Sequence, residues 1–272
     1  MESFKKNWWW IYSLVSGVAM VFYISALLHL ARLLNPELVK LSPQVIAMGA
    51  ISSALFYCIL RWPVQSKKKS PYLFAAFYGL LLSGGAYVVQ SFHYAQIPWQ
   101  WSGVWTGLLT ITIIAGVFYS PQSWMTKWGF GLRRYYLVKP LVVAWCWTVW
   151  ALMPLIFLQP LELFGMMLIS LLFVFALVLI TDIIDQNADQ STTKTIVTQW
   201  GVTKTLVLII VLSVFSEVLI WKVFGGLLPS GCILLASALP LLSLTLRKKY
   251  LSSLLVDGAL LILYFLIQGL DG

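Results

Sequence analysis

Three aspartates in the segment TDIIDQNAD are the residues best suited to carry chemistry. They are Asp182, Asp185 and Asp189, and the whole chain has only nine acidic residues. Spacings of three and seven residues place the three carboxylates on one side of a helix, where together they could hold a hard cation such as Mg²⁺. Magnesium bound in this way usually completes its coordination with substrate phosphate oxygens. The pattern therefore predicts a phosphorylated ligand.

Basic residues on either side of this segment are suited to an anionic substrate. Lys194 follows the aspartates, and Lys127, Arg133, Arg134 and Lys139 lie in the preceding cytoplasmic connection, one helix earlier in the chain. Ammonium and guanidinium groups pair well with phosphate oxygens. The alternative is that the aspartates form a solvated helix end and that the cations only follow membrane topology. The residues alone leave both interpretations open.

Long apolar runs must position these residues. Hydrophobic residues make up 60% of the 272 residues and charged residues 10%, which excludes an ordinary soluble domain. Each run of about 20 apolar residues can cross about 30 Å of hydrocarbon as a helix, and a helix satisfies its own backbone there. We predict a single all-α domain over 1–272, a polytopic membrane bundle of about nine transmembrane helices at 8–31, 43–62, 71–92, 101–120, 137–158, 160–181, 202–223, 228–246 and 250–269.

The distribution of basic residues predicts the orientation of this bundle. With the N-terminus inside, only Arg32, Lys40 and Lys222 of the eighteen Lys and Arg residues fall on the outer side. We therefore predict a multi-pass integral membrane protein whose N-terminus and basic loops are cytoplasmic and whose C-terminus is on the opposite side. The net charge of +9 is assigned to contact with anionic membrane lipids, and no nucleic-acid partner is expected.

Cysteine and histidine give no metal pattern. The three cysteines, Cys58, Cys146 and Cys232, are isolated inside apolar runs, where we expect small buried side chains. His29 and His93 are far apart and form no HExxH or comparable spacing.

Two segments resemble motifs of a known family. The segment DIIDQNADQSTTKTIVTQWG, from Asp182 to Gly201, resembles the second aspartate motif, DxxDxxxD, of the UbiA superfamily of intramembrane prenyltransferases, with the basic residue, threonine and glycine that follow it. More weakly, YSPQSWMTKWGFGLRRYYLVKP, from Tyr119 to Pro140, is similar to the family's connection after its fourth helix. Nine helices with an inside N-terminus also agree with this family, so the resemblance covers essentially the full chain.

The resemblance implies a bundle around a central cavity in which Mg²⁺ bridges aspartates and an isoprenyl diphosphate. Loss of the diphosphate would leave an allylic carbocation, which a hydrophobic acceptor such as an aromatic ring, a quinone precursor or another lipid would capture. Capture within the same chain would instead make a terpene cyclase. The resemblance assigns Asp182, Asp185 and Asp189 as metal ligands. It assigns Lys127 and Lys194 as diphosphate contacts and Tyr119 as a residue at the cavity mouth.

The chain departs from the family at its first motif, NDxxDxxxD. The corresponding stretch reads SALFYCILRWPVQSKKKSPY, and no Asp or Glu occurs between Glu37 and Glu162. A diphosphate carries about three negative charges that must be neutralised as it leaves. The basic residues of this connection could contact the phosphates in place of a second Mg²⁺, or they could only obey the topology rule; they are Arg61, Lys67, Lys68 and Lys69.

Three functions follow from these patterns. The first is a divergent prenyltransferase that binds an isoprenyl diphosphate through Mg²⁺. The second is a non-catalytic UbiA-like protein that binds an isoprenoid or serves as a membrane subunit of a partner enzyme. The third, a transporter, would use polar residues within the membrane, for which Glu217, Lys222 and Asp257 are the candidates, although they form no paired relay in the sequence.

Overall fold

The computed structural model describes most of the chain. The described residues are 2–34, 43–61, 71–95, 99–119, 135–155, 158–184, 186, 195–224, 231–243 and 249–268. Within these ranges the chain is helical, with short turns at some helix ends and no β-strand. The predicted all-α class is therefore confirmed for the described part of the chain.

The described residues form nine α-helices and one 3₁₀ turn. In chain order they are α1 (Glu2–Leu34), α2 (Pro43–Arg61), α3 (Pro71–Ala95), α4 (Trp99–Tyr119), α6 (Val138–Leu152), η2 (Met153–Leu155), α7 (Pro160–Ile184), α9 (Ile196–Phe224), α10 (Cys232–Ser243) and α11 (Lys249–Gln268).

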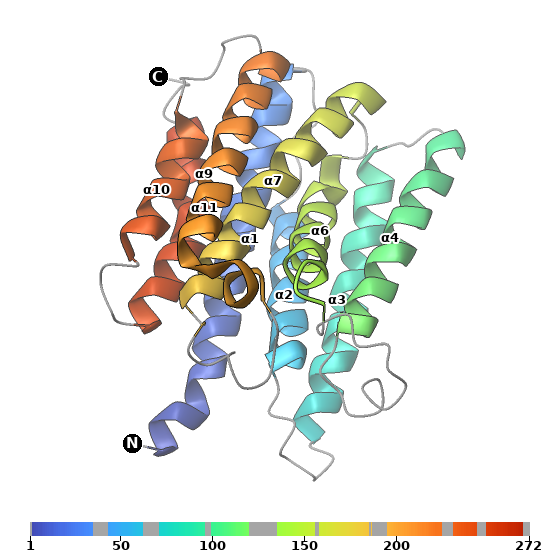
Figure 1. Ribbon diagram of the computed structural model, residues 1–272. Helices are drawn as coiled ribbons and strands as arrows, with labels where there is room; N and C mark the ends of the chain where they lie inside the picture. The colour runs from blue at the N-terminus through green and yellow to red at the C-terminus, as the bar shows by residue number, and fades with distance from the viewer. Residues whose placement is uncertain are drawn as a thin grey trace.

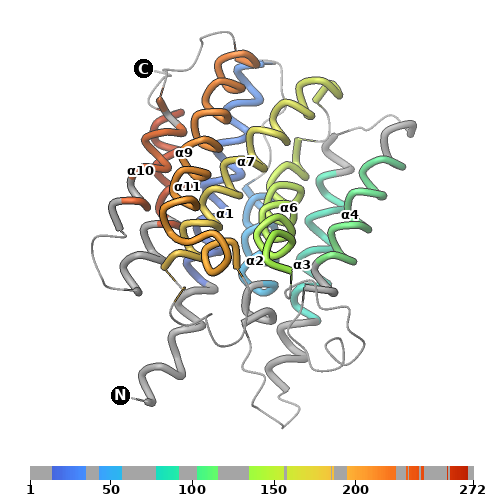
Figure 2. Tube along the Cα trace, in the orientation of Figure 1, coloured from blue at the N-terminus to red at the C-terminus, as the bar shows by residue number. Residues whose placement is uncertain are grey.

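Consecutive helices alternate in direction, as the ribbon in Figure 1 and the tube in Figure 2 show. The helix α7 lies at the centre, in contact with α6, α9, α10 and α11, while α1 packs between α2 and α11. The starts of α6 and α9 and the end of α7 lie at one end of the bundle, which we call the inner end (Figure 1). The end of α1, the start of α2 and the end of α11 lie at the other, the outer end.

Within the described ranges, four helices are long and apolar enough to cross a membrane: Leu14–Leu34 of α1, Val138–Leu155 of α6 and η2, Pro160–Ile184 and Ile196–Phe224. Apolar side chains also cover the outside of the bundle. On α9, for example, Val207, Ile210 and Val214 are 57%, 53% and 44% exposed. A soluble protein rarely leaves such a continuous apolar face in water. This surface is that of a helical membrane protein.

Hydrogen bonds between side chains join the helices inside the apolar core. Tyr23 of α1 pairs with Ser170 of α7, whose hydroxyl in turn donates to Oγ1 of Thr148 on α6 at 3.2 Å. All three are buried. Buried hydroxyls are stable in an apolar surrounding only when they are paired in this way. These two hydrogen bonds therefore fix the positions of α1, α6 and α7 relative to one another.

Trp150 joins α6 to α2 and α3. Its indole N–H lies 3.2 Å from Oγ of Ser52 and 3.3 Å from the carbonyl oxygen of Gly49, while its own carbonyl accepts a hydrogen bond from the hydroxyl of Tyr87 at 2.9 Å. The rings of Tyr87 and Trp150 also pack, with centroids 5.2 Å apart. Aromatic contact and hydrogen bonding together hold the start of the chain against its middle.

Candidate inner-end site

Asp182 lies in the last turn of α7 and belongs to the buried face of that helix. Leu179, one turn earlier on the same face, is fully buried, and Asp182 itself is only 3% exposed. An isolated carboxylate is costly in an apolar surrounding, so a buried aspartate requires compensation. The first of the three predicted metal ligands is thus placed inside the bundle rather than on a solvated helix end.

Lys139, in the first turn of α6, supplies that compensation. Its Nζ lies 2.6 Å from Oδ1 of Asp182, and the two side chains are 9% and 4% exposed. The antiparallel packing of α6 against α7 brings the ammonium to the C-terminal end of α7, where backbone carbonyls also favour a cation. The pair is therefore a buried, hydrogen-bonded ion pair between two membrane helices.

Lys139 was predicted to be one of the cations near the aspartates, but no aspartate was predicted as its partner. One feature of the sequence indicated such a partner. Lys139 immediately precedes Pro140 and opens an apolar helix, where the positive end of the helix dipole disfavours a cation. A lysine held at such a position points to an anionic partner nearby.

The other predicted site residues lie mostly outside the described residues. This applies to two of the three aspartates and to four of the proposed diphosphate contacts, namely Asp185, Asp189, Lys127, Arg133, Arg134 and Lys194. Tyr119 is the last residue of α4, which runs toward the inner end (Figure 1). Of the predicted set, the structure thus brings together Asp182 and the neighbouring cation Lys139.

A magnesium site cannot be assembled from the described residues alone. No group of three His, Cys, Asp or Glu side chains among them could hold a metal ion. Asp182 is the only one of the three predicted ligands within the described ranges, and its Oδ1 is bound to an ammonium.

The described part of the chain continues after the aspartate segment at residue 195, where α9 begins with a cap. Thr195 and Thr198 cap each other: the N–H of Thr195 donates to Oγ1 of Thr198 at 2.8 Å, and the N–H of Thr198 donates to Oγ1 of Thr195 at 3.2 Å. This is the geometry of a reciprocal capping box, with threonine in the place usually taken by glutamate or glutamine. Thr195 is fully buried.

Gly201 divides α9 into a short and a long part. Its φ of 80° and ψ of 163° are not helical and are readily adopted only by glycine, so residues 196–200 form a separate turn before the membrane helix. Oγ1 of Thr205 donates to the carbonyl oxygen of Gly201 at 2.9 Å and so supports the break. The predicted helix start at residue 202 agrees with the long part of α9, whereas the short helical turn before it was not predicted.

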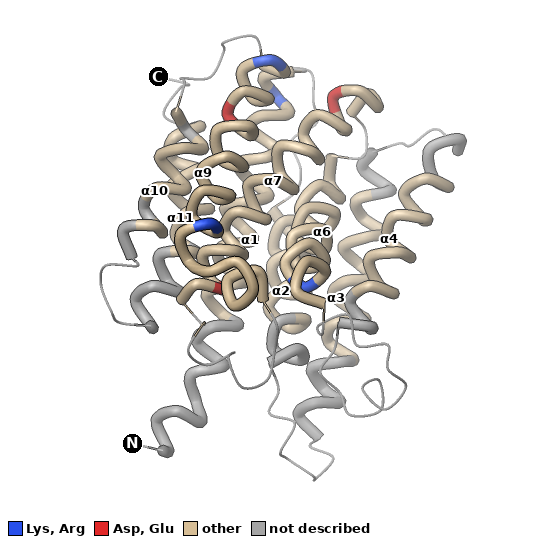
Figure 3. Tube along the Cα trace, in the orientation of Figure 1, with Lys and Arg blue, Asp and Glu red and all other residues tan. Residues whose placement is uncertain are grey.

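Charged residues toward the outer end have structural roles. Glu217 of α9 accepts hydrogen bonds from the backbone N–H groups of Gly231 and Ile233, the latter at 2.9 Å, and so caps the start of α10. Glu217 was one of the residues considered for a transporter relay, and this contact accounts for its place in an apolar helix. Figure 3 shows that the described Lys, Arg, Asp and Glu lie mainly toward the two ends of the bundle.

Comparison of the chain with protein-family models and with curated proteins yields no match. No family model matches the chain, and no curated protein is significantly similar to it. The assignment of a function therefore depends on the residues and on the geometry of the inner end.

Proposed function

We propose that this protein is a divergent prenyltransferase of the UbiA type, which binds an isoprenyl diphosphate at the inner end of a nine-helix membrane bundle and transfers the prenyl group to a hydrophobic acceptor. The observation that carries the proposal is the buried Asp182–Lys139 pair. It places the first aspartate of the DxxDxxxD segment inside the helix bundle, at the end where the segment continues.

The position of the pair favours a ligand that carries both charge and a long apolar chain. A diphosphate would lie among the aspartates and the basic connections, and the isoprenoid would extend between apolar helices. Phosphate oxygens need several cationic partners in a site of low dielectric constant. The connections on either side of α6 and α7 contain such partners in Lys127, Arg133, Arg134 and Lys194.

Asp182, Asp185 and Asp189 would hold a Mg²⁺ ion, which when bound would neutralise charge on the diphosphate. The contribution of Lys139 is separate. Its ammonium neutralises the charge of the Asp182 carboxylate and holds it in one orientation, although Asp182 is almost completely shielded from solvent. In a chain that lacks the first aspartate motif, this lysine also supplies positive charge at the inner end.

A second candidate function is supported by the same contact. Because Asp182 is already neutralised by a lysine, the chain could bind an isoprenoid without turning it over, or act as a membrane subunit of a partner enzyme. No acidic residue occurs between Glu37 and Glu162, so this part of the chain has no carboxylate ligands for a second metal ion. The two candidates differ in whether diphosphate is released.

We further propose that the inner end faces the cytoplasm. Lys139 and Lys204 lie in the inner-end parts of α6 and α9, whereas Arg32 and Lys222 lie in the last turns of α1 and α9, at the outer end. Because basic residues accumulate on the cytoplasmic side, this orientation places the aspartates there. Single cysteines introduced at residues 127 and 40 and labelled from outside intact cells would test it: only the cysteine at residue 40 should react.

The enzymatic test uses the full-length protein in liposomes with isoprenyl diphosphates of several chain lengths and Mg²⁺, measuring both diphosphate release and ligand binding. Asp185→Asn with Asp189→Asn is the informative double variant, because it leaves the Lys139–Asp182 pair intact. Glu162→Gln, in the first turn of α7 at the outer end, is the matched control. We expect release by the native chain and the control, and loss of release in the double variant.

Other results distinguish the candidates. Binding without release in the native chain would support the non-catalytic candidate. Equal release by the native chain and the double variant would remove these aspartates from the mechanism. Replacing Lys67, Lys68 and Lys69 with glutamine tests whether the basic connection contacts the diphosphate, since the apparent affinity should fall if it does; these three residues lie outside the described ranges.

A further inference from the structure

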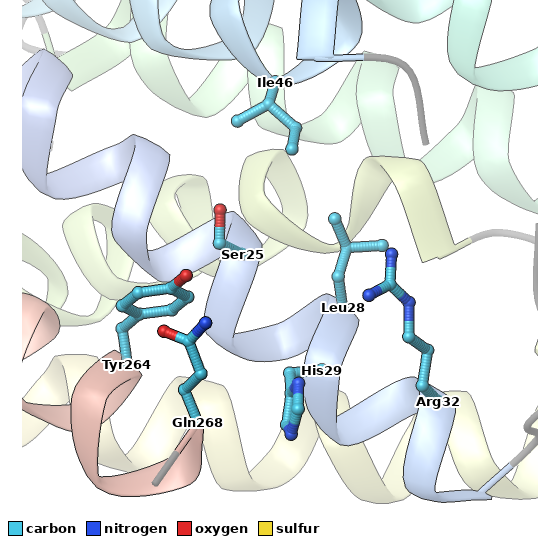
Figure 4. A pocket seen from close by; sticks show the side chains of 7 residues that line it. All are labelled: Ser25, Leu28, His29, Arg32, Ile46, Tyr264 and Gln268. Carbon is cyan, nitrogen blue, oxygen red and sulfur yellow. The ribbon is translucent and has the colours of Figure 1, made fainter. Parts of the chain in front are cut away.

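A polar cavity opens at the outer end of the bundle, away from the Asp182–Lys139 pair. It has a volume of about 190 Å³ and lies between the end of α1, the first turn of α2 and the end of α11. Figure 4 shows the described side chains that line it, which are Ser25, Leu28, His29, Arg32, Ile46, Tyr264 and Gln268. None of these seven residues is acidic.

The described residues of the lining provide one fixed positive charge and several hydrogen-bond donors. Arg32 lies on one side of the cavity, and Tyr264 and Gln268 lie on the other, with Leu28 and His29 between them (Figure 4). A guanidinium group offers N–H donors in a planar fork, the amide of glutamine offers two more, and the phenol offers one. Such a set can surround a compact oxyanion from two sides.

Helix ends around the cavity contribute partial charges. Ile46 belongs to the first turn of α2, the positive end of that helix, whereas α1 and α11 end at the cavity with their negative ends. Arg32, in the last turn of α1, offsets the negative contribution. Specific binding of an anion at this place therefore depends on the guanidinium group.

From this arrangement we propose that the outer-end cavity is a binding site for a phosphate group, with Arg32 as its anchor and Gln268 and Tyr264 as the opposing donors. A phosphate group fits within about 190 Å³, and Leu28 and Ile46 leave an apolar wall for a glycerol or acyl portion. The phosphate could belong to a phospholipid headgroup at the membrane surface or to a free phosphate ion; the chemistry of recognition is the same. The site is independent of the proposed function at the inner end.

The test measures ligand-dependent thermal stabilisation of the delipidated protein in an uncharged detergent. The probes are phosphatidylglycerol, inorganic phosphate and diacylglycerol, the last of which lacks the phosphate. Arg32→Gln removes the anchor, and Lys222→Gln is the matched control, because Lys222 is also a cation in the last turn of its helix at the outer end but does not line the cavity. Gln268→Leu removes donors from the opposite side without changing any charge.

We expect stabilisation by phosphatidylglycerol that is unchanged in Lys222→Gln, with the apparent affinity reduced ~10-fold in Arg32→Gln, as expected for loss of a hydrogen-bonded ion contact. Gln268→Leu should give a smaller loss. Stabilisation by inorganic phosphate with the same dependence on Arg32 would assign the site to the free ion. Equal stabilisation of the native chain and Arg32→Gln, or equal stabilisation by diacylglycerol, would overturn the proposal. If Arg32→Gln does not fold, undiminished binding by Gln268→Leu would overturn the arrangement of donors.

Discussion

The ammonium group of Lys139 and the carboxylate of Asp182 join the first turn of α6 to the last turn of α7, 43 residues apart in sequence. The contact is buried, so neither charge is solvated when its partner is removed. Breaking such a pair from one side usually destabilises a protein by about 3–5 kcal/mol, whereas replacing both residues by apolar ones is often neutral. Comparing the stability of a single and a double variant therefore tests whether the two charges depend on each other in the folded protein.

Replacing Lys139 with methionine should therefore lower the free energy of unfolding by about 3–5 kcal/mol, since the buried Asp182 carboxylate loses the ammonium group that lies 2.6 Å from its Oδ1. The double variant Lys139→Met, Asp182→Leu should recover most of this loss. Denaturant or thermal unfolding in detergent measures both. Lys204→Met, an exposed cation on α9, is the control and should change stability by less than ~0.5 kcal/mol. A double variant as unstable as the single one would contradict the ion-pair account.

Glu217→Ala should destabilise the start of α10, because two backbone N–H groups lose their acceptor. The expected cost is about 1–2 kcal/mol, typical of a lost helix cap. Glu217→Gln retains one acceptor oxygen and should cost less. Hydrogen exchange of the amides of residues 231 and 233 measures the local effect. Unchanged protection of these amides in Glu217→Ala would show that the cap does not stabilise α10.

Gly49→Ala should also destabilise the bundle, for a reason of packing. A Cβ atom at this position would lie 2.8 Å from a ring carbon of Tyr87. The ring is fully buried and its hydroxyl is bonded to Trp150, so it has little room to move. Overpacking of this kind costs about 1–3 kcal/mol. Gly85→Ala on α3 is the matched control, because a Cβ there meets no atom within 4 Å, and it should be neutral or slightly stabilising.

Gly201→Ala should cost about 1–2 kcal/mol, because an L-residue with a side chain rarely adopts a φ of 80°. Nothing lies within 4 Å of a Cβ at this position, so the cost arises from the backbone and not from a clash. Gly103→Ala, also without neighbours and inside α4, is the control. If the two substitutions have equal effects on thermal stability, the break at Gly201 is not maintained by its backbone conformation.

Much of the helical arrangement could be predicted from the sequence. The starts predicted at residues 43, 71 and 160 coincide with the first residues of α2, α3 and α7. Each is a proline, which is favoured in the first turn of a helix because its missing N–H has no partner there in any case. The apolar length needed to cross a bilayer then fixed the approximate helix ends.

Some helix ends could not be predicted in this way. The helix α1 covers Glu2–Leu34 and not 8–31, since polar turns can continue a helix beyond its apolar part. At Pro154 the helix α6 passes into the 3₁₀ turn η2, because proline has no N–H to continue the α-helical hydrogen bonds. Pro140 lies in the first turn of α6, where it interrupts no hydrogen bond.

The candidate site was only partly accessible to sequence reasoning. The spacing of the aspartates predicted a shared helix face, and the apolar run before them placed Asp182 at a helix end. The partner of Asp182 depends on how α6 packs against α7, which local patterns do not encode. The outer cavity was missed for the same reason: Arg32, Ile46 and Gln268 come from three separate helices, and none belongs to a recognisable motif.

The irregular backbone at Gly201 also determines how motion could reach the aspartate segment. A continuous helix would transmit tilting of the membrane-spanning rod directly to the preceding residues, since its hydrogen-bond ladder is stiff. Because the backbone at residue 201 is not helical, that ladder is interrupted between residues 196–200 and the long part of α9. The short segment has its own cap at Thr195 and Thr198, so its first turn does not depend on the long part for a partner.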